Sequence, residues 1–530
     1  MKMKRYIILF VVVTAFLGAC SDEFLETTPY DKKVIENFYK TPQDAFEGLV
    51  AAYDVLQSDD YGHIVLMSEI ASDNAFGGGG KSDGFGHNYW DWFRAEIDQN
   101  ALAWKKYYRG IYRANAILTN LDNVDWGNDE GLRNQYESEA RFLRAYYYFD
   151  LVRLFENIPL LTAPLTPGDY AQPQAHPDSV FHQIAVDLKF AIENLPDISY
   201  QAMNPDNFGR VTKWAAEALM GRVFLFYTDY YDKADLVGVV DRQQVINYID
   251  DVIDNSGHDL VEDYRTLFRA AVHGDAALEY VGEDNIETVF AIKYTYKGLG
   301  NWDDANAGAT NGMRWQKFIG IRTQDIYPYA GGWGFGTVNP KLFYDYASGD
   351  TRRSASIIDV ESEIPSFDPN DQRQYTGYAW KKFTPTLDDN GSPTVVNLGG
   401  NDQLDGFDDY PVIRFADVLL MGAELYMNGG RGQEYLDRVR DRAFQDEDHR
   451  VPANIENIRE ERRFELALEG HRYFDLIRYG MDVAKSAIDN SDPVEEFNVV
   501  FRPETGGFFK IPETQISLSE GAMKQNKGWE

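Results

Sequence analysis

The sequence has only one cysteine, Cys20, among 530 residues. No disulfide can form within the chain, so a small scaffold held by disulfides is excluded. The eight histidines lack the spacing of a metal site. The sequence also has no P-loop, no dinucleotide-binding glycine fingerprint and no Gly-x-Ser-x-Gly elbow. We therefore expect neither a metal ion nor a cofactor.

Basic side chains are scarce as well. Lys and Arg number 51 against 85 Asp and Glu, which gives a formal net charge of −34. A surface of this sign repels the phosphates of nucleic acids and anionic lipid headgroups, so nucleic-acid binding is excluded. The abundance of carboxylates also means that some pair always lies at a plausible catalytic spacing. Such pairs are therefore no evidence for a glycosidase.

Long apolar runs are absent except for one near the start. Tyr6–Leu17 is a run of about a dozen residues behind basic residues at 2–5, whereas a membrane-spanning helix needs about 20. The pattern is typical of a cleaved export signal. It ends in Leu-Gly-Ala-Cys, as bacterial lipoprotein signals do. We predict a signal peptide at 1–19 and a lipid on Cys20; the alternative is an ordinary signal with a chance cysteine.

A lipidated Cys20 would hold the mature chain at a membrane, because several acyl chains together anchor a protein stably. Loss of the three basic residues of the signal would move the formal charge from −34 to −37. The rest of the chain is long and 44% hydrophobic, so it can bury a large core.

The first half of the sequence has the 3.6-residue periodicity of amphipathic helices. Helices are expected at about 41–56, 100–121, 132–155 and 177–196, the first one capped by Thr41 with proline at its first position.

Two later segments resemble each other. Ala216–Tyr227 and Ala416–Tyr426 share a Leu-Met-Gly step, and each precedes a second amphipathic helix. Gly221 and Gly422 would let the paired helices approach closely. Such pairs suggest tetratricopeptide-like stacking, although no strict 34-residue period is present. Ile458–Gly480 is predicted to be a single helix with surface ion pairs, Arg462 with Glu465 and Glu469 with Arg472.

Between about 274 and 410 the helical periodicity gives way to Gly, Asn, Asp and aromatic residues, with short β-like runs such as Glu287–Tyr296. We therefore predict a mostly α fold: a tetratricopeptide-like helical-pair scaffold with a loop-rich inserted region that carries short strands. The expected parts are a signal peptide at 1–19, an N-terminal helical region at 20–273, a loop-rich region with ligand-binding loops at 274–410, and a C-terminal helical region with a tail at 411–530.

Several blocks together resemble the SusD/RagB family. They are EARFLRAYYYFDLVRLFENIPL (Glu139–Leu160), GRVTKWAAEALMGRVFLF (Gly209–Phe226), YPVIRFADVLLMGAELY (Tyr410–Tyr426), LDRVRDRA (Leu436–Ala443) and the ending FFKIPETQISLSEGAMKQNKGW. They follow the family's order almost from end to end. One departure is Ser519–Ala522, where relatives tend to carry an Asn-Pro pair.

The resemblance implies a non-catalytic lipoprotein on the outer face of the outer membrane. In such proteins, acidic residues directly after the cysteine, here Asp22 and Glu23, mark export to the cell surface. Members of the family capture oligosaccharide, or in some cases peptide, and pass it to a SusC-like TonB-dependent barrel. The shared blocks identify the fold, so the ligand site must be sought in the loops.

Glycine-rich loops with large flat side chains suit the stacking of sugar rings, which expose apolar C–H faces and a polar rim. Five of the ten tryptophans lie in two such stretches. The candidate ligand-binding residues are Trp90, Trp92, Trp302, Trp315 and Trp333, with Tyr329, Asp73, Asn74, Asp83 and Asn88. Some of these aromatics could instead anchor loops or face the barrel. Trp104, Trp214 and Trp380 are expected in the core, and the role of Tyr327 stays open.

Three stacked rings that each bury about 60 Å² would contribute roughly 4–5 kcal/mol at 25 cal/mol/Å², which gives micromolar to millimolar affinity.

Asn401–Val412 begins like an EF-hand but has Val412 where the bidentate Glu belongs, so calcium is not expected there. Three alternatives remain: a peptide ligand, a lipid-anchored glycoside hydrolase, and a purely structural lid for the transporter.

Overall fold

The computed structural model describes residues 38–58, 61–96, 100–273, 275–297, 311–427, 430–489 and 497–530. The predicted signal peptide, Cys20 and Trp302 lie outside the described residues.

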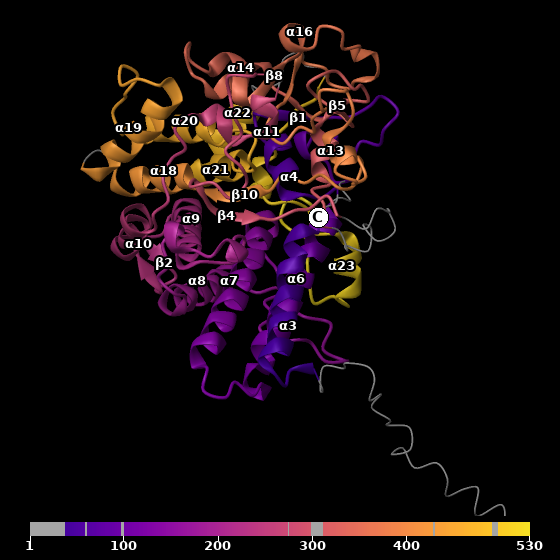
Figure 1. Cartoon of the computed structure of the whole chain (residues 1–530). Helices are drawn as coiled ribbons and strands as arrows, with labels where there is room; N and C mark the ends of the chain where they lie inside the picture. Colours follow the sequence, from indigo (N-terminus) through magenta and orange to yellow (C-terminus); the bar gives the residue numbers. More distant parts are fainter. Residues whose placement is uncertain are drawn as a thin grey trace, which may run out of the picture.

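The lower half of the molecule is a set of stacked helices (Figure 1). They are α3 (Pro42–Asp54), α6 (Asn100–Asn120), α7 (Glu130–Phe155), α8 (Pro177–Asn194), α9 (Lys213–Tyr231) and α10 (Arg242–Asn255). Helix α7 packs against α6 and α8, and α9 packs against α8 and α10. The start of α3 is a capping box in which Thr41 Oγ1 accepts the Asp44 N–H at 3.2 Å and Asp44 accepts the Thr41 N–H at 2.9 Å.

The second helical pair, α18 (Phe415–Tyr426) and α19 (Arg431–Phe444), packs beside α10. A Cβ atom on Gly422 would lie 2.7 Å from the Tyr435 ring, and one on Gly221 would lie 2.7 Å from Ile249. The helices therefore approach more closely than a larger residue allows, as the sequence predicts. The mostly α fold with few short strands is confirmed.

Short antiparallel ladders join distant parts of the chain. Strand β4 (Thr288–Ile292), inside the predicted β-like run, pairs with β10 (Tyr410–Arg414). Strand β1 (Ala75–Gly78) pairs with β7 (Phe335–Val338), so that the two glycine-rich stretches lie side by side. The other strands of the described residues are β2 (Asp235–Leu236), β3 (Val240–Asp241), β5 (Ile321–Arg322), β6 (Gly331–Gly332), β8 (Ile357–Asp359) and β9 (Tyr378–Trp380).

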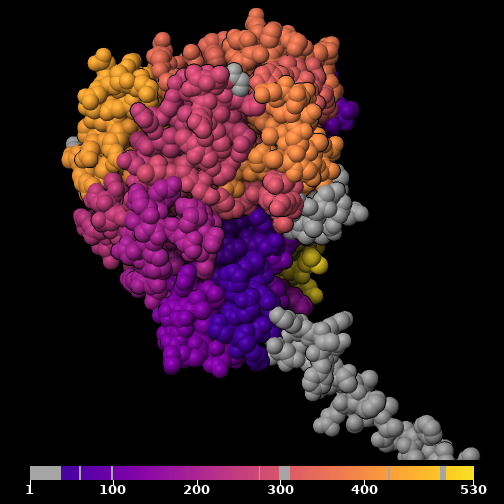
Figure 2. Space-filling model, viewed as in Figure 1, coloured from indigo at the N-terminus to yellow at the C-terminus, as the bar shows by residue number. Residues whose placement is uncertain are grey.

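On the face seen in Figure 2, the segment coloured magenta to pink lies between the C-terminal helices in yellow-orange and an orange part of the loop-rich region. One continuous hydrophobic core contains side chains from all three parts, among them Phe290, Trp380 and Phe415. The loop-rich region therefore packs directly against the helical body.

The single helix predicted at Ile458–Gly480 is wrong. The structure has α20 (Ile455–Glu465) and α21 (Arg472–Tyr479), with left-handed backbone at Leu468 (φ 64°) and Gly470 (φ 84°) between them. The buried carboxylate of Glu69, on α4 (Ile64–Ile70), accepts the N–H groups of Gly470 at 2.8 Å and of His471 at 3.2 Å. A carboxylate at this break satisfies backbone donors that a continuous helix would have paired internally.

The predicted surface ion pairs of this segment are also wrong, because the charges are buried. Glu465 accepts hydrogen bonds from Arg414 at 2.8 Å, Arg442 at 2.7 Å and Arg352 at 3.1 Å. Glu469 pairs with Arg414 at 2.8 Å. The predicted partners pair elsewhere: Arg462 with Asp417 and Asp475, and Arg472 with Asp73.

We call Glu465, Glu469, Arg352, Arg414 and Arg442 the buried ion cluster; all five side chains are at most 4% exposed. Burial alone would raise the pKa of Glu465, but the three guanidinium groups outweigh it and hold that pKa below its usual range. The cluster joins β10, α19, α20 and the start of α15 (Arg352–Ser356).

Glu465→Gln should destabilise the protein by about 3–5 kcal/mol, because it leaves three buried cations without their shared carboxylate. Urea unfolding followed by circular dichroism measures the change. Glu96→Gln is the matched control, since Glu96 forms an exposed pair with Arg94 whose loss should leave the stability nearly unchanged. Equal stability of the two variants would contradict a structural role for the cluster.

Glu217 on α9 is 1% exposed and lies 3.8 Å from Lys213. Burial, reinforced by Asp251, raises its pKa from 4.5 to about 9. The folded protein therefore keeps a proton that the unfolded chain releases near pH 4.5, so this group lowers stability as the pH rises from about 4.5 to 9.

Glu217→Gln should remove that decline, making the stability of the variant less dependent on pH by up to about 1.4 kcal/mol per unit between pH 5 and 8. Urea midpoints at several pH values measure the slope. If the curves of the variant and the wild type stay parallel, Glu217 is ionised in the folded protein and the predicted shift is absent.

Candidate ligand-binding site

Two arginines fasten the glycine-rich loop after β1 to the loop-rich region. Arg322 donates to Asp83 at 2.9 Å and to the carbonyl of Trp333 at 3.1 Å. Arg373 donates to the carbonyl of Asp83 at 2.6 Å and to Asn88 Oδ1 at 2.7 Å. Gly79 adds a backbone bond to Gly334 at 2.7 Å, with left-handed backbone (φ 84°) that glycine adopts easily. Both loops are thereby held in one arrangement.

Three nearly parallel rings lie where these loops meet the helical body. Phe318, on α13 (Trp315–Ile319), has its ring centroid 4.8 Å from those of both Tyr61 and Trp333, with interplanar angles of 15° and 20°. Phe318 is fully buried, whereas Tyr61 and Trp333 are partly exposed. We call the exposed part of this stack the Tyr61–Trp333 face. It is a fixed aromatic surface of the kind that holds sugar rings.

Charged groups lie close to the Tyr61–Trp333 face. The Asp83 side chain is 29% exposed and pairs with Arg322, which also donates to the carbonyl of Trp333. Burial raises the pKa of Tyr61; the charge of Arg314 opposes the rise and that of Asp83 adds to it. Lys317 bonds Asp402 at 2.7 Å, and its carbonyl accepts the Trp333 N–H at 2.9 Å. Carboxylates and cations next to flat rings can bind sugar hydroxyls.

A second aromatic group lies on the same glycine-rich loop. Phe85 is 46% exposed, its ring lies 5.5 Å from that of Trp92, and the guanidinium of Arg373 lies 4.3 Å above it. The buried ring of His87, two residues after Phe85, lies 5.9 Å from that of Tyr61. Burial lowers the pKa of His87 to about 3, so the imidazole is neutral at physiological pH.

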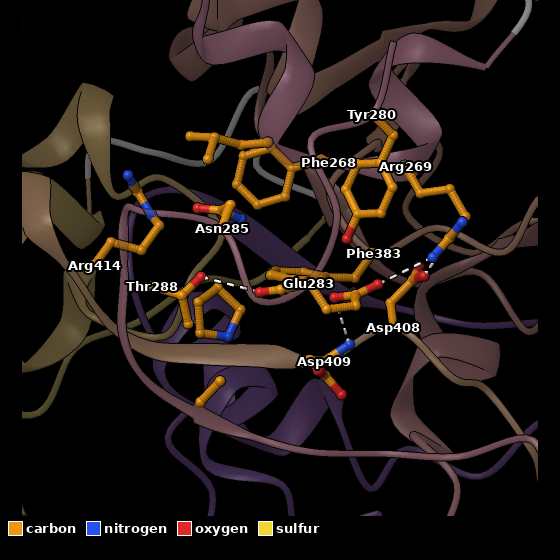
Figure 3. Close-up of a pocket in the computed structure, with 13 residues that line it drawn as sticks. Phe268, Arg269, Tyr280, Glu283, Asn285, Thr288, Phe383, Asp408, Asp409 and Arg414 are labelled. Carbon is orange, nitrogen blue, oxygen red and sulfur yellow. Dashed lines mark hydrogen bonds and ion pairs between the residues drawn. The ribbon is translucent and has the colours of Figure 1, made fainter. Parts of the chain in front are cut away.

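Figure 3 shows a narrow pocket between β4, β10 and the segment around Phe268. Its volume of about 20 Å³ has room for one water molecule. Arg269 bonds Asp408 at 2.7 Å, and the Asp409 N–H donates to Glu283 at 3.0 Å. Burial and the two neighbouring aspartates raise the pKa of Glu283 to about 8. This pocket is a packed acid cluster, too small for a sugar.

A wide apolar groove lies between α6, α23 (Glu513–Leu518) and the loop around Tyr170, with a volume of about 720 Å³. Tyr170 and Leu518 are 66% and 71% exposed at its edge, and Trp104 and Met523 line it. We call it the α6–α23 groove. Figure 1 shows α23 beside α6, on the helical half of the molecule.

Comparison with known proteins identifies the family. Residues 23–225 match a family described as "Starch-binding associating with outer membrane", and residues 368–529 match the SusD family. The chain is 31% identical to a laminarin-binding SusD-like protein of known structure, with 92% of this chain and 100% of that one covered and a TM-score of 0.75. The chain belongs to the SusD/RagB family.

Other relatives agree over nearly the whole length. Surface glycan-binding protein A from Bacteroides fluxus is 25% identical over 92% of this chain and 100% of its own, with a TM-score of 0.77. SusD-like protein P2 from Formosa agariphila is 25% identical over 99% of this chain and 100% of its own. These members of the SusD/RagB family are named for binding or for the family itself, and their names indicate no enzymatic family.

Two features of the described residues bear on the predicted function of this SusD/RagB protein. None of the helices there combines the length and apolarity needed to cross a bilayer. In the same part of the chain, no three His, Cys, Asp or Glu side chains are arranged to hold a metal ion.

Three of the predicted stacking residues are buried in the structure. Trp90 and Trp315 are completely buried, the first donating to Asn100 at 3.1 Å and the second stacked 5.1 Å from the ring of His63. Tyr329 is 2% exposed and donates to Glu363 at 2.5 Å. These rings are packed among distant side chains, which leaves no face for a sugar.

Three of the predicted polar residues hold the loops in place instead. Asp73 is ion-paired with Arg472 at 2.7 Å, Asn74 donates to Glu69 at 2.9 Å, and Asn88 donates to Gln374 at 2.6 Å. All three are at most 4% exposed. Polar groups buried to this extent are satisfied within the protein and are unavailable to a ligand.

Trp92, Trp333 and Asp83 are the predicted site residues that stay partly exposed within the described part of the chain. Trp104, Trp214 and Trp380 are buried, as expected. The tryptophan pattern of the sequence does not point to Tyr61 or Phe85, which lie near these exposed residues. Phe85 lies in the same glycine-rich stretch as Trp90, so the signal was present, whereas the position of Tyr61 depends on its contact with the distant Phe318.

Proposed function

We propose that this protein is a cell-surface glycan-binding lipoprotein that passes captured oligosaccharide to a SusC-like TonB-dependent transporter of the outer membrane. The Tyr61–Trp333 face carries the proposal, since it combines partly exposed stacked rings with Asp83, Lys317 and Asp402 close by. The family description and the laminarin-binding relative support a glycan ligand at a membrane surface. Laminarin is therefore the first polysaccharide to test.

Binding without catalysis is favoured over the hydrolase alternative because the charged groups at the face are engaged in ion pairs. Asp83 is paired with Arg322, and Asp402 with Lys317. A general acid needs a carboxyl group with a raised pKa close to the scissile bond. Retarded mobility in a laminarin-containing gel without release of reducing ends would support binding, and catalytic release would overturn it.

Trp333→Ala should weaken glycan binding about tenfold, because one sugar ring stacked on about 60 Å² of indole contributes about 1.5 kcal/mol. Isothermal titration with the polysaccharide that retards the wild-type protein in gels measures the change in affinity. Tyr112→Ala is the control, since Tyr112 is 47% exposed on α6, away from the loops. Unchanged affinity of Trp333→Ala, with normal unfolding, would exclude this face as the site. A peptide ligand is the other outcome that titration with peptide mixtures would reveal.

The α6–α23 groove is our candidate surface for the transporter. Large apolar side chains exposed at the edge of a groove favour a protein partner, and Tyr170 and Leu518 have the exposure expected of anchor residues. The groove is lined by the helical half, so a partner there would leave the Tyr61–Trp333 face to the ligand.

Leu518→Glu should reduce the amount of TonB-dependent barrel that co-purifies with the lipidated protein from detergent-solubilised outer membranes, because a charge would enter an apolar contact. Val50→Glu, a substitution of a 47% exposed residue on α3, is the control. Equal recovery of the barrel with both variants would place the transporter contact elsewhere.

Protease added to intact cells should cleave the protein, and full protection would contradict surface display.

A further inference from the structure

A separate pocket lies on the far side of the loop that precedes Trp333. It has a volume of about 370 Å³, within the range of small-molecule sites. Its charged and aromatic lining comprises Arg265, His273, Asp275, Tyr327, Glu363 and Lys381. We call it the Tyr327 pocket. It shares no lining residue with the Tyr61–Trp333 face.

The floor of the Tyr327 pocket is a carboxylate held in a fixed position. Glu363 Oε2 accepts the Tyr329 hydroxyl at 2.5 Å and pairs with Lys381 Nζ at 2.7 Å, and Oε1 accepts the Asp359 N–H at 3.1 Å. Tyr329 and Lys381 are buried, but the Glu363 side chain is 30% exposed. A carboxylate offers about four acceptor positions. Three are used, and the exposed oxygen edge can accept a further hydroxyl.

The wall of the pocket is a flat ring. Tyr327 is 49% exposed, and the His273 ring lies next to it at an interplanar angle of 50°, with the centroids 5.6 Å apart. The Tyr327 hydroxyl donates to Asp389 at 3.4 Å, and the His273 ring is itself bonded to the carbonyl of Leu387. The phenol is therefore held in place while about half of the residue stays exposed. An exposed ring beside a fixed carboxylate matches the apolar face and the hydroxyl rim of a pyranose.

The charges that line the pocket determine which class of ligand it favours. Arg265 and Lys381 are balanced by Asp275 and Glu363, so the lining has no net charge when His273 is neutral. An acidic or a basic ligand gains little from such a surface, and the net charge of −34 repels acidic ligands. A neutral, hydroxyl-rich ligand fits best.

We propose that the Tyr327 pocket is a second glycan subsite, which holds one or two neutral sugar rings by stacking on Tyr327 and by a hydroxyl hydrogen bond to Glu363. The assignment of a glycan as the ligand of this pocket rests on the proposed function. The position of the pocket does not, since none of its residues belongs to the Tyr61–Trp333 face. Two weak sites on one chain bind a long polymer more tightly than a short oligosaccharide, because the second contact is intramolecular. The pocket thus gives the protein a preference for polysaccharide over its fragments.

The test uses full-length mature protein and the neutral polysaccharide that wild type retains in native gels, with laminarin tried first. Tyr327→Ala and Glu363→Gln should each weaken polymer binding about tenfold and leave the affinity for a short oligosaccharide at the Tyr61–Trp333 face unchanged. Trp333→Ala should keep residual binding that is lost when Tyr327→Ala is added. Tyr344→Ala is the matched control, because Tyr344 is 71% exposed and lies outside the pocket.

Normal thermal unfolding of Tyr327→Ala confirms that the variant is folded, and Glu363→Gln keeps the side-chain volume. If wild type binds and both substitutions leave polymer affinity unchanged, the subsite is refuted while the proposed function stands. If wild type binds none of a panel of neutral polysaccharides, both are refuted. If Tyr327→Ala and the control Tyr344→Ala reduce polymer affinity equally, the subsite is also refuted.

Discussion

The buried ion cluster around Glu465 fixes how several distant segments of the chain are placed relative to one another. Three arginines that lie far apart in the sequence, Arg352, Arg414 and Arg442, meet on this one carboxylate. Ions taken out of water are costly unless every one has a partner, so the cluster tolerates only one relative placement of the segments that supply it. Its main effect is therefore to fix the relative positions of these segments rather than to add stability.

The placement of the loops follows from that geometry. Glu69 reaches the break between α20 and α21, and Asp73, four residues further on, pairs with Arg472 on α21. Strand β1 begins directly afterwards, at Ala75, and its pairing with β7 brings the second glycine-rich stretch alongside. The Tyr61–Trp333 face is thus assembled on a rigid base. A rigid base reduces the ordering cost of capture, which matters when each stacked ring contributes little.

The composition of the loops also explains why so many of their aromatics are buried. A loop of glycines has few apolar side chains of its own, so large rings such as those of Trp90 and Trp315 attach it to the core. Only the rings left over at the surface are available to a ligand. The same division holds at the second pocket, where Tyr329 is buried beneath and its near neighbour Tyr327 is exposed.

The absence of disulfides within the chain, the helical scaffold with its paired helices and the family can be read from the sequence, because cysteine count, periodicity and short motifs are local properties. Which rings are exposed, where the charges of 458–480 pair, and the division of this segment into two helices depend on tertiary contacts. Whether Trp315 is buried depends on His63, and whether Glu465 is paired depends on Arg352, and contacts across such separations leave no mark on the local pattern of residues.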